Sequence, residues 1–333
     1  MRRSLVFLIA LPVLAQQAAV ALRPALHARF LAREEAAKVL TSDDYFQQLQ
    51  VAELRAKTGL ELKDATPGQA RIAAKAHYAA GTQDFSADEQ ALLRGVLDRV
   101  APQVAAKLPL MARTPFTFIK ADAEGGLPHT RGACIILSPR LLGALLKGMQ
   151  TGAQARVDAF ASSLLVHEQT HVLERQHPEL FAQLFTEVFG FKRLTAVPDA
   201  PSIQAARVLN PDGPDLGWAF PIPDGATVRW IRPDLQLKAL DHPRMPQDFR
   251  LVAVNLVAKD GGFALAMDAS GQPRVEDLEA IPAYKAAFPD LDESFHPNEI
   301  AAELLAGWVT GQDKDAAQPL RSRTAAWADK ALR

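Results

Sequence analysis

Apolar residues recur at steps of three and four along most of the chain, the spacing that places them on one face of an α-helix. Residues 25–108 follow this pattern almost throughout and are rich in Ala, Leu, Glu, Lys, Arg and Gln. Ser86 with Glu89 three positions later fits a capping box, and Thr66 followed by Pro67 fits a second helix start. The helical pattern returns at 139–149, 153–176, 178–189, 297–309 and 320–332.

Short β-prone runs interrupt these helices. Residues 116–119 and 133–137 are bounded by Gly and Pro, and the runs 249–258 and 263–267 are joined by a turn ending in Gly261 and Gly262, which predicts a hairpin. The fold class expected is therefore α+β, mainly helical with a small β-sheet.

Residues 197–246 hold nine of the 23 prolines in the chain. No long helix can pass through so many prolines, so this proline-rich insertion is expected to be an irregular excursion or a set of surface loops. The pattern changes from helical to β-prone near Pro115. This divides the chain into an N-terminal helical region, 16–112, and a region with the candidate catalytic residues, 113–333. The first is interpreted as a scaffold, with a substrate-covering lobe or an inhibitory pro-segment as the alternative.

Residues 1–15 have the pattern of a secretory signal peptide. Arg2 and Arg3 precede the apolar run Leu5–Ala15, which is followed by polar glutamines. Cleavage is expected after Ala15 or as late as Ala21. The run is far shorter than the about 20 residues of a spanning helix, and no later stretch is apolar enough, so we expect an exported protein, periplasmic or secreted, with no stable membrane span.

The composition narrows the chemistry. Apolar residues make up 48% of the chain and charged residues 23%, which excludes wholesale disorder. The 37 basic and 38 acidic residues balance, and this argues against a nucleic-acid binder. Cys134 is the single cysteine, which excludes an intramolecular disulfide and a Cys-rich zinc cluster.

The most informative stretch is His-Glu-Gln-Thr-His at 167–171, inside a helical pattern with apolar residues on both sides. His167 and His171 are four residues apart and so share one helix face, where neutral imidazoles can bind one Zn²⁺. Glu168 lies beside that position and can take the proton from a metal-bound water. A core helix does not carry two histidines and a glutamate unless something pairs with them, so one zinc ion per chain is predicted.

A catalytic zinc needs a third protein ligand, and two residues compete for the role. His177 lies ten positions after His167, but Glu174 stands where a glycine would allow the sharp helix break that this ligand needs. The other is Glu299, near the start of a helix that follows Pro297, with Glu303 one turn later on the same face. Glu299 is preferred, and His177 is kept as the alternative metal ligand.

The motif His167-Glu168-x-x-His171, with Asn298-Glu299-x-x-x-Glu303 downstream, resembles the gluzincin class of zinc metallopeptidases. The resemblance implies a zincin-like core with the zinc between two helices. It also implies that His167, His171 and Glu299 bind zinc, that Glu168 is the general base and that Glu303 supports a ligand histidine.

The class further implies an edge strand that binds extended substrate upstream of the zinc helix. Residues Arg131–Leu137 are in the right order for it, and an internal strand is the alternative. A donor to the transition state is also needed, for which Tyr284, His296 and His242 are candidates.

These observations predict an exported zinc-dependent hydrolase, first of all a peptidase acting on a peptide or protein substrate. Hydrolysis of another amide or ester would use the same residues. The alternative from a different class is a non-catalytic, zinc-stabilised binding or scaffold protein of the cell envelope.

Overall fold

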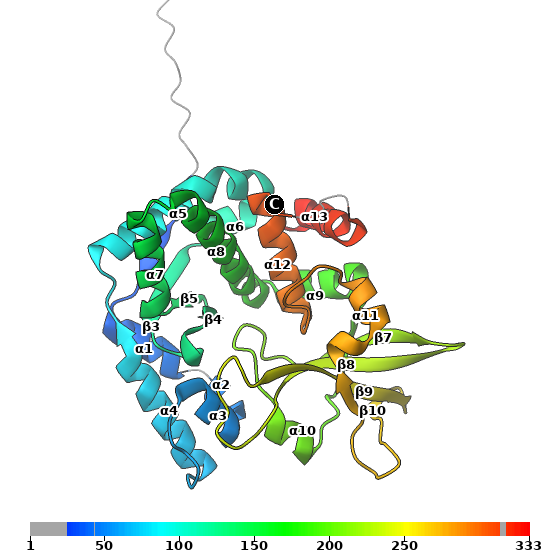
Figure 1. The fold of residues 1–333 in the computed structure, drawn as a ribbon. Coiled ribbons are helices and arrows are strands. Elements are labelled where there is room, and N and C mark those ends of the chain that lie inside the picture. The colour runs from blue at the N-terminus through cyan, green and yellow to red at the C-terminus, as the bar shows by residue number, and fades with distance from the viewer. Residues whose placement is uncertain (1–24, 43, 314–317) are drawn as a thin grey trace, which may run out of the picture.

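The computed structural model describes residues 25–42, 44–313 and 318–333 (Figure 1). The expected signal peptide lies outside these residues. Helices and strands are both abundant, so the fold is mixed α and β, compatible with the expected α+β class. Among the residues described, no helix has both the length and the apolar character needed to cross a membrane.

The α-helices are α1 (Arg33–Ser42), α2 (Tyr45–Gln48), α3 (Val51–Thr58), α4 (Pro67–Gly81), α5 (Ala87–Lys107), α6 (Pro109–Arg113), α7 (Pro139–Gln150), α8 (Gln154–Gln176), α9 (Pro178–Gln183), α10 (Pro201–Ala206), α11 (Pro282–Ala287), α12 (Pro297–Thr310) and α13 (Pro319–Ala331). Short turns of other helix types are η1 (Glu124–Gly126), η2 (Leu184–Val188) and η3 (Leu278–Ala280). The strands are β1 (Ala28–Phe30), β2 (Thr82–Gln83), β3 (Phe116–Ala121), β4 (His129–Arg131), β5 (Cys134–Leu137), β6 (Lys192–Arg193), β7 (Trp218–Asp224), β8 (Thr227–Leu237), β9 (Phe249–Lys259), β10 (Gly262–Leu265) and β11 (Val275–Asp277).

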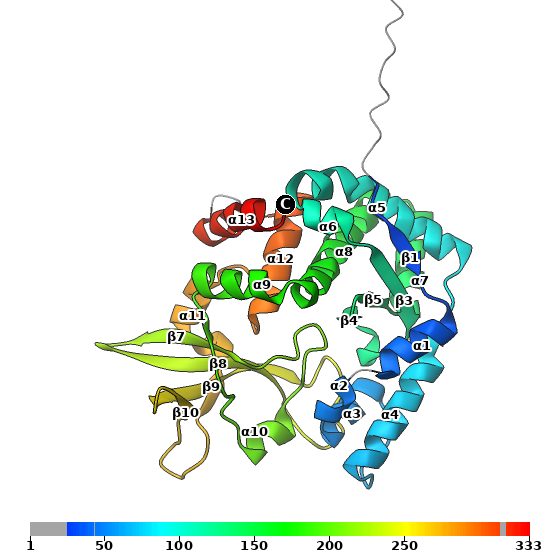
Figure 2. The same cartoon turned by 180° about the vertical axis from the view of Figure 1, so that it is seen from behind.

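The first sheet lies between two layers of helices. Its strand order is β1-β3-β5-β4, with β2 pairing on β3. Alternate residues of β3 and β5 point to opposite faces, because side chains alternate along a strand. Phe118 and Ile135 pack into the core shared with α5 and α8, whereas Ile119 and Ile136 pack into the core shared with α1 and α4. The two views show α5, α7 and α8 on one side of this sheet and α1 and α4 on the other (Figures 1 and 2).

The boundary expected at 112/113 does not separate two independent units. Strand β1 runs parallel to β3, with Ala28 opposite Phe116, so the N-terminal region supplies part of the central sheet. Strands of three and two residues, such as β1 and β2, are too short to leave a periodic signal. Within that region the two expected helix starts are confirmed: capping boxes join Ser86 with Glu89 and Thr66 with Gln69.

The second sheet is antiparallel, in the order β10-β9-β8-β7-β6, with β11 on β9. The hairpin of β9 and β10 is confirmed. The proline-rich insertion is not wholly irregular, because β7 and β8 lie within it. Pro221 and Pro223 lie where β7 has passed the end of β6, and Pro233 lies where β8 has passed the end of β7. Proline is tolerated at such free edges because its missing N–H breaks no ladder bond. With two sheets in the described ranges, the β content exceeds the small sheet expected.

Helices α8 and α12 pack side by side, although more than a hundred residues separate them (Figure 1). Leu165, Val166 and Leu173 of α8 and Ile300 and Leu304 of α12 are buried in the same core. This packing turns the second half of α8 toward the first turn of α12, where the candidate chemistry lies.

Candidate metal centre

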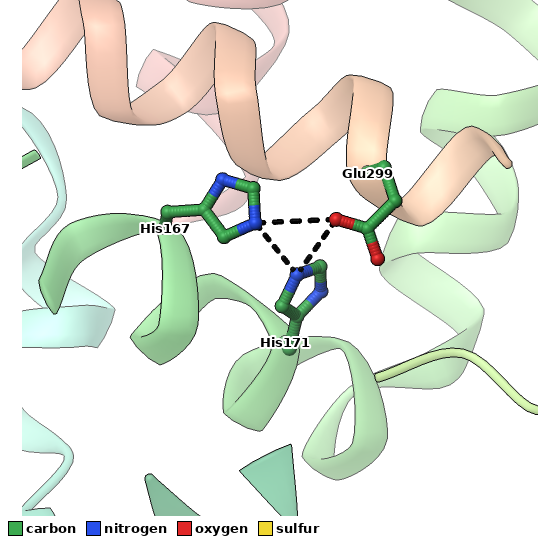
Figure 3. A group of neighbouring side chains, drawn as sticks. All are labelled: His167, His171 and Glu299. Atoms are coloured by element: carbon green, nitrogen blue, oxygen red, sulfur yellow. Dashed lines mark hydrogen bonds and ion pairs between the residues drawn. The ribbon is translucent and has the colours of Figure 1, made fainter. Parts of the chain in front are cut away.

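The candidate metal centre lies between α8 and α12. His167, Glu168 and His171 are on α8, and Glu299 is in the first turn of α12, after Pro297 at the first helical position. The side chains of His171 and Glu299 are almost fully buried, and that of His167 is 18% exposed. Figure 3 shows the two imidazoles and the carboxylate pointing toward one common space.

Three donor atoms form a triangle of the size that one ion needs. His167 Nε2 and His171 Nε2 are 3.1 Å apart, and Glu299 Oε2 lies 3.2 Å from the first and 3.3 Å from the second. Zinc bonds of about 2.1 Å at tetrahedral angles place neighbouring donor atoms about 3.4 Å apart. Within the described residues these three side chains form the group whose donor atoms converge in this way. His167, His171 and Glu299 therefore could hold a metal ion.

The pKa values of Glu299 and His171 are shifted in the directions that favour binding of a cation at the site. Burial alone would raise the pKa of Glu299, but His171 and His167 outweigh it and hold that pKa well below its usual range. Burial alone would lower the pKa of His171, but Glu299 and Glu174 outweigh it and raise that pKa. The site therefore carries negative charge that attracts a proton, and a divalent ion would use the same attraction.

Glu174 supports the ligand His171. Its Oε2 lies 2.9 Å from His171 Nδ1, so Nδ1 donates to the carboxylate and Nε2 is left free for a metal. The sequence reasoning treated Glu174 only as a missing glycine. The signal that could have found it is its spacing of three from His171, which places both on one helix face.

Glu303 does not have the role expected for it. Its carboxylate accepts from the backbone N–H groups of Asp292 and Glu293, at 3.0–3.2 Å, and so fixes the chain just before α12. Glu303 and Glu299 do share a helix face, but His171 is reached from its own helix by Glu174 instead.

Glu168 lies beside the triangle and has a free oxygen. The residue is 3% exposed, and its Oε2 has no hydrogen-bond partner among the described residues. Burial raises its pKa well above the usual range, and the charge of Asp212 adds to the rise. Glu168, His167 and Glu299 all line a cleft of about 1170 Å³.

The alternative ligand and two of the candidate donors are placed elsewhere. His177 forms the junction of α8 and α9 and is not part of the converging group. Tyr284 is a core residue: its ring packs against Phe220 and its hydroxyl donates to Ser294 O. His242 is largely exposed, beside Arg55.

His296 also has another task. Its Nδ1 accepts from the N–H of Asn298 and its Nε2 donates to Asp215 O at 2.6 Å, so both ring nitrogens are occupied in capping α12. Neither Tyr284 nor His296 lines the cleft, so the structure does not bring either predicted transition-state donor to the metal centre.

The edge strand is β4 rather than the run expected. Strand β5 is internal, between β3 and β4, and of residues 131–137 only Arg131 belongs to β4. The outward N–H of Thr130 donates to Asp212 Oδ1 at 2.5 Å, and Arg175 donates to Thr130 O. The segment 209–213 thus covers the edge on which an extended peptide was expected to pair.

The segment 209–213 also reaches the metal centre, a contact that sequence reasoning missed. Asn210 donates through its side-chain amide to Glu299 Oε1, the oxygen that faces away from the histidines. A side chain at Gly213 would collide with the amide of Asn298, so glycine permits the close approach.

Helix α3 anchors the segment 209–213 through buried charges. Leu209 donates its N–H to Glu53 at 2.6 Å and accepts from Lys57 Nζ at 2.7 Å. Lys57 also pairs with Glu124 at 2.7 Å. Burial alone would raise the pKa of Glu124, but Lys57 and Arg131 outweigh it and lower that pKa to about 2.

Searches of protein-family models, curated proteins and solved structures found no match to this chain. The function is therefore argued from the geometry of the site.

Proposed function

We propose that the protein is an exported zinc-dependent hydrolase, with peptidase activity as its leading form. The single observation that carries the proposal is the triangle of His167, His171 and Glu299 beside the unpaired, buried Glu168 in an open cleft. Two histidines, one glutamate and a free position make up a ligand set of catalytic zinc sites. The same arrangement supports the resemblance to gluzincins and a zincin-like core.

The donor set favours zinc among common metal ions. Imidazole nitrogen suits zinc and other late transition metals, whereas magnesium and calcium prefer oxygen donors alone. A bound zinc would supply an electrophile that lowers the pKa of a coordinated water to about 7. His171 is held in the ligating tautomer by Glu174.

Glu168 would carry the proton transfers. Its free Oε2 accepts a proton from the attacking water and then passes it to the leaving nitrogen of the scissile amide. A purely structural site needs no such base and closes its ligand set with a fourth residue. The open cleft and the unpaired Glu168 oxygen therefore favour the hydrolase over the non-catalytic scaffold.

The experiment that tests this proposal is metal analysis combined with a peptide-mixture assay. We expect about one zinc ion per purified chain, hydrolysis of peptides detected by mass spectrometry, loss of that activity with a chelator, and recovery on adding zinc. Stoichiometric zinc with no hydrolysis of peptides, other amides or esters would contradict the hydrolase and leave the scaffold function.

Removing the support of His171 is expected to weaken the metal site without abolishing it. Glu174→Ala leaves Nδ1 of His171 without its acceptor, so zinc affinity should fall about 10–100-fold. Competition with a chelating dye measures the change, and Glu179→Ala on the exposed side of α9 is the matched control. Equal affinities for the two variants would show that Glu174 does not orient the ligand.

A further inference from the structure

The cleft is strongly acidic, although the chain as a whole is nearly neutral. Twelve of the residues that line it are Asp or Glu and four are Lys or Arg, against 38 and 37 in the whole chain. Ion pairs neutralise three of the acidic residues, because Glu124 pairs with Lys57, Asp313 with Arg321, and Glu276 with Arg229. Nine acidic and two basic lining residues remain outside these pairs. Even with a divalent ion bound, the cleft would hold an excess of negative charge.

Four of the acidic lining residues follow β11 in the sequence, and we call them the acidic rim: Glu279, Asp290, Asp292 and Glu293. All four residues are exposed and belong to the link between β11 and α12. Within the described part of the chain none of them forms an ion pair with a lysine or an arginine. Burial and the neighbouring charge of Glu299 raise the pKa of Glu293 to about 8. The exposed carboxylates of Glu279, Asp290 and Asp292 are therefore the ones free to pair with a cationic group of a ligand.

The acidic rim begins next to the metal centre. The carboxylate of Glu293 lies 3.7 Å from His167 Nε2. Glu303 holds the backbone of Asp292 and Glu293 in place through hydrogen bonds to their N–H groups. The end of the rim at Asp292 and Glu293 is thus held next to the metal centre.

A second feature of the cleft is His129, whose buried ring has a hydrogen-bond acceptor without a donor. His129 is 1% exposed and lines the cleft, and its Nδ1 donates to Leu127 O at 3.0 Å. Nε2 of the neutral ring is therefore an acceptor, and it has no partner among the described residues. The other unpartnered buried atom in the cleft, Glu168 Oε2, is an acceptor too. Each of these acceptors would be satisfied by a hydrogen-bond donor.

We infer that the cleft selects cationic peptides, with a lysine or arginine side chain near the scissile bond received by the acidic rim. The inference rests on the proposed peptidase function, whose substrate class it names. Negative charge lining a cleft concentrates and orients cationic ligands, and cationic side chains also bring the donors that the free acceptors lack.

The test measures binding apart from turnover. Zinc-loaded Glu168→Gln protein is titrated into fluorescent peptides of equal length that differ only in carrying Lys, Gln or Glu at the same positions. We expect the Lys peptide to bind about tenfold more tightly than the Gln peptide, and the Glu peptide to bind most weakly. Salt of about 0.5 M should remove most of the difference.

A triple variant assigns the effect to the rim. Adding Glu279→Gln, Asp290→Asn and Asp292→Asn should abolish the preference for the Lys peptide, and Glu293 is left intact because it lies beside His167. The matched control removes equal charge from exposed sites away from the cleft, with Glu34→Gln, Asp98→Asn and Glu187→Gln, and should keep the preference.

Equal affinities for the three peptides, no measurable binding, or a preference that survives the triple variant would overturn the inference. Hydrolysis by the wild-type protein is assayed separately. Charge-selective binding without any hydrolysis would contradict the peptidase function but would still support the inferred class of ligand.

Discussion

Glu299→Ala is expected to release the metal from a chain that stays folded. Loss of a residue that only supports a ligand lowers metal affinity by up to about 100-fold. The variant removes one of the three ligands themselves, so its zinc affinity should fall by more than that. The fold should persist because α12 is held by buried neighbours such as Ile300 and Leu304. Zinc per chain, measured by elemental mass spectrometry on parallel preparations, gives the result.

Glu279→Gln is the matched control for that variant, because Glu279 lines the same cleft but lies outside the triangle. It should keep its zinc. Full zinc content in Glu299→Ala would show that another side chain completes the site, and His177→Ala would then test the alternative ligand.

Glu168→Gln is expected to keep the metal and lose turnover. The substitution preserves the shape of a side chain that is 3% exposed, so packing should not change. It removes the oxygen that accepts the proton, and loss of a general base costs about 10²–10⁴-fold in rate. Hydrolysis and zinc content are measured on the same sample.

A graded control for this variant is Glu168→Asp, which keeps a carboxylate on a side chain that is shorter by one methylene group. Its rate should lie between those of wild type and Glu168→Gln. Undiminished hydrolysis by Glu168→Gln would contradict the assignment of Glu168 as the base.

The parts of the site that sequence could predict are those set by local geometry. His167 and His171 face one way because four residues make about one helical turn, and Glu299 follows a proline that starts α12. The positions of these residues relative to one another depend on α8 packing against α12. The motif implied that packing, whereas periodicity alone could not.

The structure differs from the expected site where long-range contacts determine the partner of a side chain. Glu303 lies on the predicted helix face, but its carboxylate accepts from the backbone just before α12. Both ring nitrogens of His296 form hydrogen bonds at the start of α12. Asn210 reaches Glu299 from the proline-rich insertion, where no local pattern points to a metal. Strand β1 is three residues long and becomes a strand only because β3 is beside it.

The link from α3 through Leu209 and Asn210 to Glu299 has a thermodynamic consequence. Since residues from three distant parts of the chain meet at one point, an ion bound there would act as a clamp on the whole tertiary structure. Each tenfold rise of free zinc above its dissociation constant would then add about 1.4 kcal/mol to the free energy of unfolding. The concentration of free zinc would thus set the stability of the folded chain.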